Sequence, residues 1–216
     1  MELKLIQPWS VPVVKTELPQ EVLNTMIEIT DLIIDDSNSS SLGNSLAGQI
    51  EKELVIDIEL LKLTGVMKFF TELMRQFVII CKCQMTPTEK KEIVQKKWIS
   101  DITRMWVVSQ KPNEYNPFHV HGDYKFPCDI SSVMYLKVPR MLPSRKKNGS
   151  DGHIYFSGNV SRDIKFSLPS VTFSPQVGDF YLFGSHQQHG VYPFRCTNGE
   201  KNDERRSVSF NAKIRE

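Results

Sequence analysis

The feature that most constrains the fold of this chain is a change in hydrophobic patterning near Trp98. Before it, apolar residues recur at spacings of three and four, which is typical of amphipathic helices. After it, short runs rich in Val, Ile, Tyr and Phe alternate with Gly, Pro and Asn, which is typical of strands joined by turns. We expect about eight strands, at residues 102–110, 118–122, 131–138, 153–157, 170–173, 179–184, 190–194 and 206–214.

The N-terminal part predicts several helices. The first is expected at residues 21–34, with Pro19 near its first turn, and a second at residues 45–63. The clearest spans residues 66–80, where a stripe recurs with helical spacing: Val66, Phe69, Phe70, Leu73, Met74 and Phe77. A further helix is expected from Thr86-Pro87 to about Trp98. We interpret the stripe as a face that packs on a sheet, because apolar stripes of this kind usually belong to a core.

Length and composition fit a single domain over residues 1–216. The chain has 216 residues, of which 40% are apolar and 24% charged, typical of a globular protein. We expect residues 1–98 to form mostly helical support and residues 99–216 to form the sheet core. Eight antiparallel strands suggest an α+β fold built on a jelly roll, or double-stranded β-helix, with a ligand pocket between its sheets.

Charge and cysteine content exclude some classes of protein. A net charge of +2 gives no strong signal for a nucleic-acid partner, and we interpret the basic loop at Arg145, Lys146 and Lys147 as solvated surface. The four cysteines include no C-x-x-C pair, so reduced thiols are expected. The sequence shows neither a signal peptide nor a membrane span, which favours a cytoplasmic protein. The sequence leaves the oligomeric state open.

Three histidines carry the chemistry. His119 and His121 lie in EYNPFHVHGDY, and His189 lies in GSHQQHGVYPF. On an extended strand His119, His121 and Asp123 share a face. Two neighbouring ligands and a distant third form a facial triad, which holds ferrous iron and leaves positions open. The spacing alone permits either His119 or Asp123 beside His121, and an aspartate would offset part of the metal charge.

The sequence also contains two further histidines and two adjacent arginines near these motifs. His186 is the closest rival of His189 as the distal ligand, and His153 is read as an ordinary core or surface residue. Val177-Gly178-Asp179 predicts a tight turn before the strand that leads toward His189. In RRSVSFN, strand alternation places Arg205 with Ser207 and Asn211, and Arg206 on the opposite face.

Several long motifs carry a family resemblance. NPFHVHGDYKFPCDISSVMYLKVP, PQVGDFYLFGSHQQHGVYPF and RRSVSFN together resemble the 2-oxoglutarate and iron(II)-dependent oxygenases of bacteria and marine phages, within the prolyl-hydroxylase-like superfamily. PWSVPVV and SLAGQIEKE are also similar to that group. The resemblance implies a double-stranded β-helix that uses Fe(II), 2-oxoglutarate and O₂. It favours His119, His121 and His189 as metal ligands and keeps Asp123 as the alternative ligand.

The same resemblance implies a reaction and a cosubstrate anchor. Oxidative decarboxylation of 2-oxoglutarate would be coupled to hydroxylation of an unknown substrate, either a small molecule or a protein side chain. The R-x-S pattern implies that Arg205 and Ser207 hold the far carboxylate of 2-oxoglutarate, since arginine binds carboxylates bidentately. The hydroxyl of Tyr135 is a further candidate, although a core aromatic is an equal interpretation. Protein prolyl hydroxylation is the nearest analogy for the substrate.

The remaining candidates are polar and aromatic residues close to the motifs, and two loops. Asn116 and Asn211 are plausible polar groups near the site, whereas Trp106 and Phe118 are expected in the core. We expect substrate selection in the loops at residues 123–130 and 140–152, because loops of this kind usually carry specificity.

Two alternatives come from other functional classes. One is a non-catalytic metal-binding jelly roll, in which the histidines hold zinc in a closed coordination sphere. The other is a cupin-like dioxygenase, in which three histidines hold iron and no 2-oxoglutarate is used. Arg205 in its R-x-S pattern argues against the second alternative.

Overall fold

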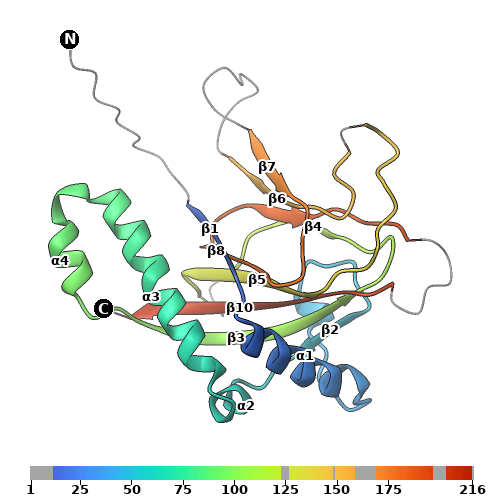
Figure 1. Cartoon of the computed structure of the whole chain (residues 1–216), viewed down its shortest axis with the longest axis horizontal. Helices are drawn as coiled ribbons and strands as arrows, with labels where there is room; N and C mark the ends of the chain where they lie inside the picture. Colours follow the sequence, from blue (N-terminus) through green and yellow to red (C-terminus); the bar gives the residue numbers. More distant parts are fainter. Residues whose placement is uncertain (1–11, 123–126, 148, 159–168, 197–202, 216) are drawn as a thin grey trace.

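The computed structural model describes residues 12–122, 127–147, 149–158, 169–196 and 203–215. Over these residues the strands form two antiparallel sheets (Figure 1). The major sheet has the order β1-β8-β5-β10-β3-β2, and the minor sheet has the order β4-β9-β6-β7. This mixed arrangement of helices and two antiparallel sheets confirms the α+β jelly-roll expectation.

All eight strands expected from the sequence are present. In the major sheet these are β3 (Ile99–Gln110), β5 (Ile130–Lys137), β8 (Asp179–Gly184) and β10 (Arg205–Arg215). The minor sheet consists of β4 (Asn116–His119), β6 (Ile154–Ser157), β7 (Ser170–Phe173) and β9 (His189–Val191). Two strands were not expected: β1 (Val13–Glu17) and β2 (Lys52–Val55) form the edges of the major sheet. The N-terminal part therefore contributes edge strands as well as helices.

The helices are α1 (Gln20–Asp35), α2 (Ile58–Leu63), α3 (Val66–Met85) and α4 (Lys90–Gln95), with short 3-10 turns at Gly43–Ser45 and Pro87–Glu89. The helix predicted at residues 45–63 is therefore wrong over most of its length. Strand β2 occupies its centre, because Lys52–Val55 pair with Trp106 to Ser109 of β3. Helix α2 begins only after Asp57, whose carboxylate accepts a hydrogen bond from the backbone N–H of Glu59 at 2.9 Å. None of the helices in the described ranges is long and apolar enough to cross a lipid bilayer.

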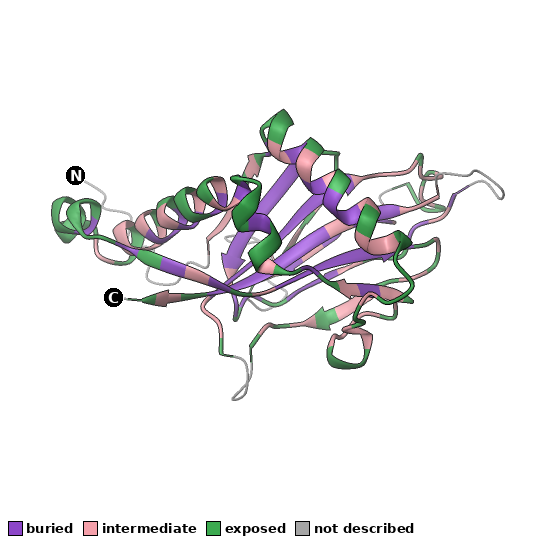
Figure 2. Cartoon of the chain, turned by 90° about the horizontal axis from the view of Figure 1, so that it is seen from below, coloured by how far each residue is buried: buried purple, intermediate pink, exposed green. Residues whose placement is uncertain are grey.

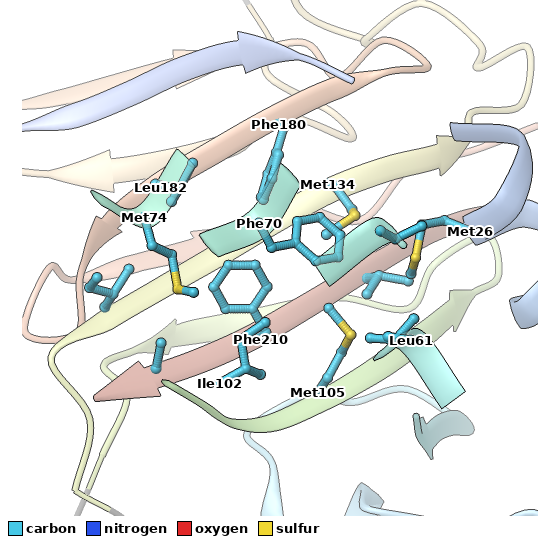
Figure 3. Close-up of a cluster of buried hydrophobic side chains, with 14 of the residues drawn as sticks. Met26, Leu61, Phe70, Met74, Ile102, Met105, Met134, Phe180, Leu182 and Phe210 are labelled. Carbon is cyan, nitrogen blue, oxygen red and sulfur yellow. The ribbon is translucent and has the colours of Figure 1, made fainter. Parts of the chain in front are cut away.

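The helices cover one face of the major sheet (Figure 2). Phe70 of α3 lies at the centre of this contact, with its ring centroid 5.9 Å from that of Phe180 and 5.6 Å from that of Phe210 (Figure 3). Met26 of α1 and Met74 of α3 are fully buried in the same cluster. The apolar stripe of residues 66–80 thus packs on the sheet as predicted, and each such side chain contributes roughly 2–3 kcal/mol through burial.

The other face of the major sheet packs on the minor sheet. Val133, Tyr135, Tyr181 and Phe183 of β5 and β8 meet Ile154 and Phe156 of β6. Because side chains alternate along a strand, Met134 and Leu182 point to the helices instead. Both faces of these central strands are therefore buried, and their sequences are almost continuously apolar for this reason.

The tight turn predicted before β8 is also present. Gly178 has a φ of 91°, a conformation that suits glycine, and its N–H donates to the carbonyl of Tyr135 at 2.8 Å. The carboxylate of Asp179 accepts a hydrogen bond from the N–H of Gln176 at 3.1 Å. This turn fixes the start of β8, which runs toward the segment that carries His189.

Candidate metal and cosubstrate site

Three histidines from two parts of the chain meet in the minor sheet. His119 is the last residue of β4 and pairs with His189, the first residue of β9. His121 follows β4, and its backbone N–H donates to the carbonyl of Ser185 at 2.9 Å. One ligand atom of each ring lies within 4.8 Å of those of the other two. Among the described residues, this is the one group of His, Cys, Asp or Glu side chains placed to hold a metal ion together.

Backbone carbonyls orient two of the three rings. Nδ1 of His119 lies 2.7 Å from the carbonyl oxygen of Pro117, and Nδ1 of His189 lies 2.8 Å from that of Gln187. A carbonyl oxygen only accepts hydrogen bonds, so each Nδ1 carries the proton and each Nε2 keeps a free lone pair. Nε2 of His121 lies 3.1 Å from Nε2 of His189. The nitrogens that can bind a metal therefore converge.

The surroundings of the cluster are apolar and aromatic. The ring of His189 lies 4.6 Å from that of Phe183, and the ring of His121 lies 5.9 Å from that of Trp106. Burial lowers the pKa of His189 to about 3, with a further contribution from His119. Burial also lowers the pKa of His121 well below its usual value, as do the two neighbouring histidines. The imidazoles are therefore neutral at pH 7, which is the state that binds metals.

The structure distinguishes the candidate histidines that join the cluster from those that lie outside it. His186, the rival of His189, is exposed, and neither His186 nor His153 joins the cluster. Asp123, the alternative ligand, lies outside the described residues. The strand expected at residues 118–122 ends at His119, yet His119 and His121 still reach the same site.

A small inner cavity of about 40 Å³ adjoins the three histidines. Its lining includes every other residue proposed from the sequence for cosubstrate binding, namely Tyr135, Arg205 and Ser207. These residues come from β5 and β10, which are neighbours in the major sheet, and Ser207 pairs with Tyr135 across the two strands. The sheets thus bring the metal cluster and the anchor residues to one cavity.

Arg205 is a buried cation. Its side chain is 1% exposed, and its guanidinium donates hydrogen bonds to the side-chain oxygen of Gln110 and the carbonyl of Gly152. The guanidinium also lies 5.0 Å from the ring centroid of Phe194. No carboxylate among the described residues pairs with it. Burial lowers the pKa of Arg205 to about 10, so it stays charged at neutral pH and favours an anionic ligand.

Tyr135 adds a hydroxyl to the same cavity. Its side chain is buried, and its hydroxyl has no hydrogen-bond partner among the described residues. Burial raises the pKa of Tyr135 to about 12, so the hydroxyl keeps its proton. Together, Arg205, Tyr135 and Ser207 offer donors to a carboxylate, while the histidines offer lone pairs to a metal. This donor set fits a metal-bound keto acid.

Arg206 has a structural role on the opposite face of β10. It donates to Asp31 of α1 at 2.6 Å and to Glu204 at 2.8 Å. Its strand neighbours Val208 and Phe210 belong to the core beneath the helices. The alternation of Arg205 and Arg206 therefore follows the sequence prediction.

A larger outer cavity of about 260 Å³ lies beside the inner one. Both cavities are lined by Trp106, Asn116, His119 and His121, so two of the three histidines border both of them. Asn116 and Asn211 line these cavities, as proposed. Trp106 is buried as expected but also lines both cavities, whereas Phe118 is 49% exposed and its assignment to the core was wrong. Phe118 stacks on Tyr155 at the surface instead.

Sequence reasoning missed two residues of this region. Gln110, which accepts from Arg205, lines the inner cavity, and Glu53 of β2 lines the outer cavity. The incorrect helix over residues 45–63 concealed Glu53. A strand there would have shown that Glu53 alternates with Leu54 and faces away from the apolar core.

Several solved structures share this fold at low sequence identity. A prolyl hydroxylase from Trichoplax adhaerens has a TM-score of 0.55 and 12% identity, covering 94% of this chain and 83% of that one. A prolyl-4-hydroxylase from Pseudomonas putida has a TM-score of 0.52 and 12% identity, covering 93% and 92%. The viral collagen prolyl hydroxylase of Paramecium Bursaria Chlorella virus-1 has a TM-score of 0.50 and 15% identity, covering 93% and 94%. At such identities the likeness establishes the fold.

The family itself is established by the sequence of the sheet core. No curated protein matches the chain significantly. A family model described as "Putative 2OG-Fe(II) oxygenase" matches residues 104–211, which run from β3 to β10 and contain all three histidines and Arg205. The chain therefore belongs to the 2OG-Fe(II) oxygenase family, whose enzymes use Fe(II), 2-oxoglutarate and O₂.

Proposed function

We propose that this oxygenase holds Fe(II) through His119, His121 and His189 and hydroxylates a side chain of a protein or peptide. Iron bound there would supply the oxidising chemistry, using O₂ and the decarboxylation of 2-oxoglutarate to succinate. The convergence of three imidazoles in one partly buried cluster is the observation that carries this proposal. Three protein ligands leave positions open for the cosubstrate and O₂.

We further propose that 2-oxoglutarate lies in the inner cavity with its far carboxylate on Arg205. The buried guanidinium without a described acidic partner and the unpartnered hydroxyl of Tyr135 support this placement. The cavity is small, and we expect side chains around it to move when 2-oxoglutarate binds. The hydrogen bond between Arg205 and Gln110 is the first candidate, because a carboxylate would replace the neutral amide as a stronger acceptor.

The proposed substrate class rests on structural relatives. The structure from Trichoplax adhaerens holds a peptide fragment of hypoxia inducible factor, and the viral relative is a collagen prolyl hydroxylase. Both therefore point to peptide substrates. The outer cavity of about 260 Å³, which His119 and His121 line, would accept such a side chain.

The first experiment is an anaerobic titration of the Fe(II)-loaded protein with 2-oxoglutarate. We expect a weak visible charge-transfer band that saturates, because a chelating keto acid interacts electronically with ferrous iron. The band should be absent from His121→Ala and His189→Ala. Bound iron without any band would instead favour a cupin-like or purely structural metal site.

A second experiment distinguishes His119 from Asp123 as the third ligand. The orientation of the His119 ring by the carbonyl of Pro117 favours His119. Metal content should then fall in His119→Ala and stay close to that of the unmodified protein in Asp123→Asn. The reverse result would assign the carboxylate to the metal.

A further inference from the structure

The outer cavity contains a buried carboxyl group that lacks a partner. Glu53 is 1% exposed and lines this cavity together with His119 and His121. Its Oε2 has no hydrogen-bond partner among the described residues. Burying a polar group without a partner costs free energy, so such a group usually indicates a missing ligand or water.

The major sheet and the loop before β2 hold this carboxyl in the outer cavity, beside the candidate metal ligands His119 and His121. Glu53 pairs with Val108 of β3, so it stands on the same face as Trp106 and the rest of the cavity wall. The chain before β2 crosses over it: a Cβ added to Gly48 would lie 2.5 Å from Oε1 of Glu53. A backbone bridge between Gln49 and Tyr115 fastens this loop. The carboxyl is thus confined between the loop and β3.

A second acceptor faces the same cavity. Oδ1 of Asn116 is buried and has no hydrogen-bond partner among the described residues. Arg104 also lines the cavity, and it donates to the hydroxyl of Ser45 at 3.3 Å. Two acceptors without donors favour a ligand rich in N–H groups.

We propose that the outer cavity binds the substrate through a cationic nitrogen, an ammonium or guanidinium group held by Glu53 and Asn116 beside the metal site. This inference rests on the proposed function, and it narrows the substrate to a side chain of the lysine or arginine type. The carbons next to that nitrogen would then lie on the side of the cavity formed by His119 and His121.

The electrostatic surroundings of the Glu53 carboxyl also favour a cationic substrate group. Burial raises the pKa of Glu53 to about 7, and the negative charge of Glu114 adds to the effect. A bound cation would favour the ionised carboxyl, and each charge would compensate the burial of the other. A neutral ligand of the same shape would provide fewer donors and no such compensation. We therefore expect the site to prefer a charged nitrogen to a hydroxyl by at least about tenfold.

The test compares two probes of equal size. Nα-acetyl-lysine methylamide carries the ammonium, and its 6-hydroxynorleucine analogue carries a hydroxyl in its place. Dissociation constants are measured by NMR on the full chain loaded with Zn²⁺ and 2-oxoglutarate, and again on the metal-free chain; an arginine and citrulline pair repeats the comparison for guanidinium. Glu53→Gln keeps the size of the side chain and removes its charge. Gly48→Ala keeps the charge but displaces the carboxyl.

A matched control removes a nearby charge outside the cavity. Glu51 is exposed and pairs with Lys111 at 2.9 Å, so Glu51→Gln should keep the preference of the unmodified protein. We expect Glu53→Gln to lose that preference and Gly48→Ala to reduce it. Equal affinity for the charged and neutral probes of both pairs, including no measurable binding of any, would overturn the inference, as would a preference that survives Glu53→Gln.

The design also separates this inference from the proposed function. Retention of 2-oxoglutarate by the metal-loaded protein is measured in the same samples. Loss of that retention with an intact preference for the cationic probes would contradict the proposed cosubstrate site alone. Retained 2-oxoglutarate without the preference would contradict the role of Glu53 alone.

Discussion

At the scale of single residues, the two adjacent arginines of β10 test the proposed site: Arg205 is the proposed cosubstrate anchor, and Arg206 forms ion pairs on the opposite face. Replacing Arg205 by Ala removes the buried guanidinium from the inner cavity. Because bidentate hydrogen bonds to a carboxylate are strong, we expect a loss of about 3 kcal/mol, or on the order of a 100-fold weaker affinity for 2-oxoglutarate. Calorimetric titration of the Mn²⁺-loaded protein with 2-oxoglutarate measures this change.

The neighbouring arginine is the control. Arg206→Gln breaks the ion pairs with Asp31 and Glu204 on the opposite face of β10. Since the variant loses the charge-assisted hydrogen bonds that the buried Arg206 makes to α1 and Glu204, it should unfold at a lower temperature and still bind 2-oxoglutarate normally. If both variants weaken cosubstrate binding equally, Arg205 has no specific anchoring role.

Glu53 makes stability depend on pH. Its pKa is about 7 in the folded protein and near 4.5 when unfolded, so the folded state binds the proton more tightly. The contribution of this proton binding to the free energy of unfolding is fully present below pH 4.5 and is lost as the pH rises through 7. The free energy of unfolding of Glu53→Gln, relative to that of the unmodified protein, should therefore rise by about 2 kcal/mol between pH 5 and pH 8.

Urea unfolding of metal-free protein at both pH values measures this difference. Comparing the two proteins at each pH cancels the titration of the histidines, which both share. A stability difference that does not change with pH would show that the carboxyl is already ionised or hydrated in the folded protein.

At the scale of elements, helix α3 supports the sheet through one apolar stripe. Phe70 is fully buried between Phe180 and Phe210, so Phe70→Ala leaves a cavity in the core. We expect a loss of about 3–5 kcal/mol in the free energy of unfolding. Leu63→Ala, at an 86% exposed position at the end of α2, should change stability by less than about 0.5 kcal/mol. Similar losses in both variants would contradict the packing of α3 on the sheet.

The elements also show what local sequence can predict. The stripe of α3 repeats with a helical period, and β3, β5, β8 and β10 contain runs of strand-favouring residues between turn signals, so all five elements were found from the sequence. Residues 45–63 contain a turn, a short strand and a short helix, and β2 exists because Lys52–Val55 pair with β3 far along the chain. Such pairing leaves no periodic signal in a segment this short.

At the scale of the whole molecule, the site joins residues that only the fold brings together. Recognisable motifs indicated the candidate residues: the H-x-H spacing for His119 and His121, the following GVYP for His189, and the R-x-S pattern for Arg205 and Ser207. Gln110 and Glu53 have no such motif, and their roles follow from neighbours across β10 and β3. The sequence therefore predicted most of the polar residues around both cavities but missed Gln110 in the inner cavity and Glu53 in the outer one.

Joint binding of metal and cosubstrate should stabilise the whole domain in a defined order. If His119, His121 and His189 hold the metal as proposed, 2-oxoglutarate would bind to that metal and its far carboxylate would reach Arg205. A ligand at 100 times its dissociation constant stabilises the folded state by about 2.7 kcal/mol, which corresponds to roughly 5–10 °C in a chain of this size. Thermal unfolding should show this shift for 2-oxoglutarate only when Mn²⁺ is present.

Two variants resolve the order of binding. His189→Ala should lose both the metal-dependent and the 2-oxoglutarate-dependent increases in unfolding temperature, because the metal ligand set is incomplete. Arg205→Ala should keep the increase caused by Mn²⁺ and lose most of that caused by 2-oxoglutarate. An equal stabilisation by 2-oxoglutarate with and without Mn²⁺ would mean that the cosubstrate binds independently of the histidine cluster, and the two halves of the inner cavity would not form one site.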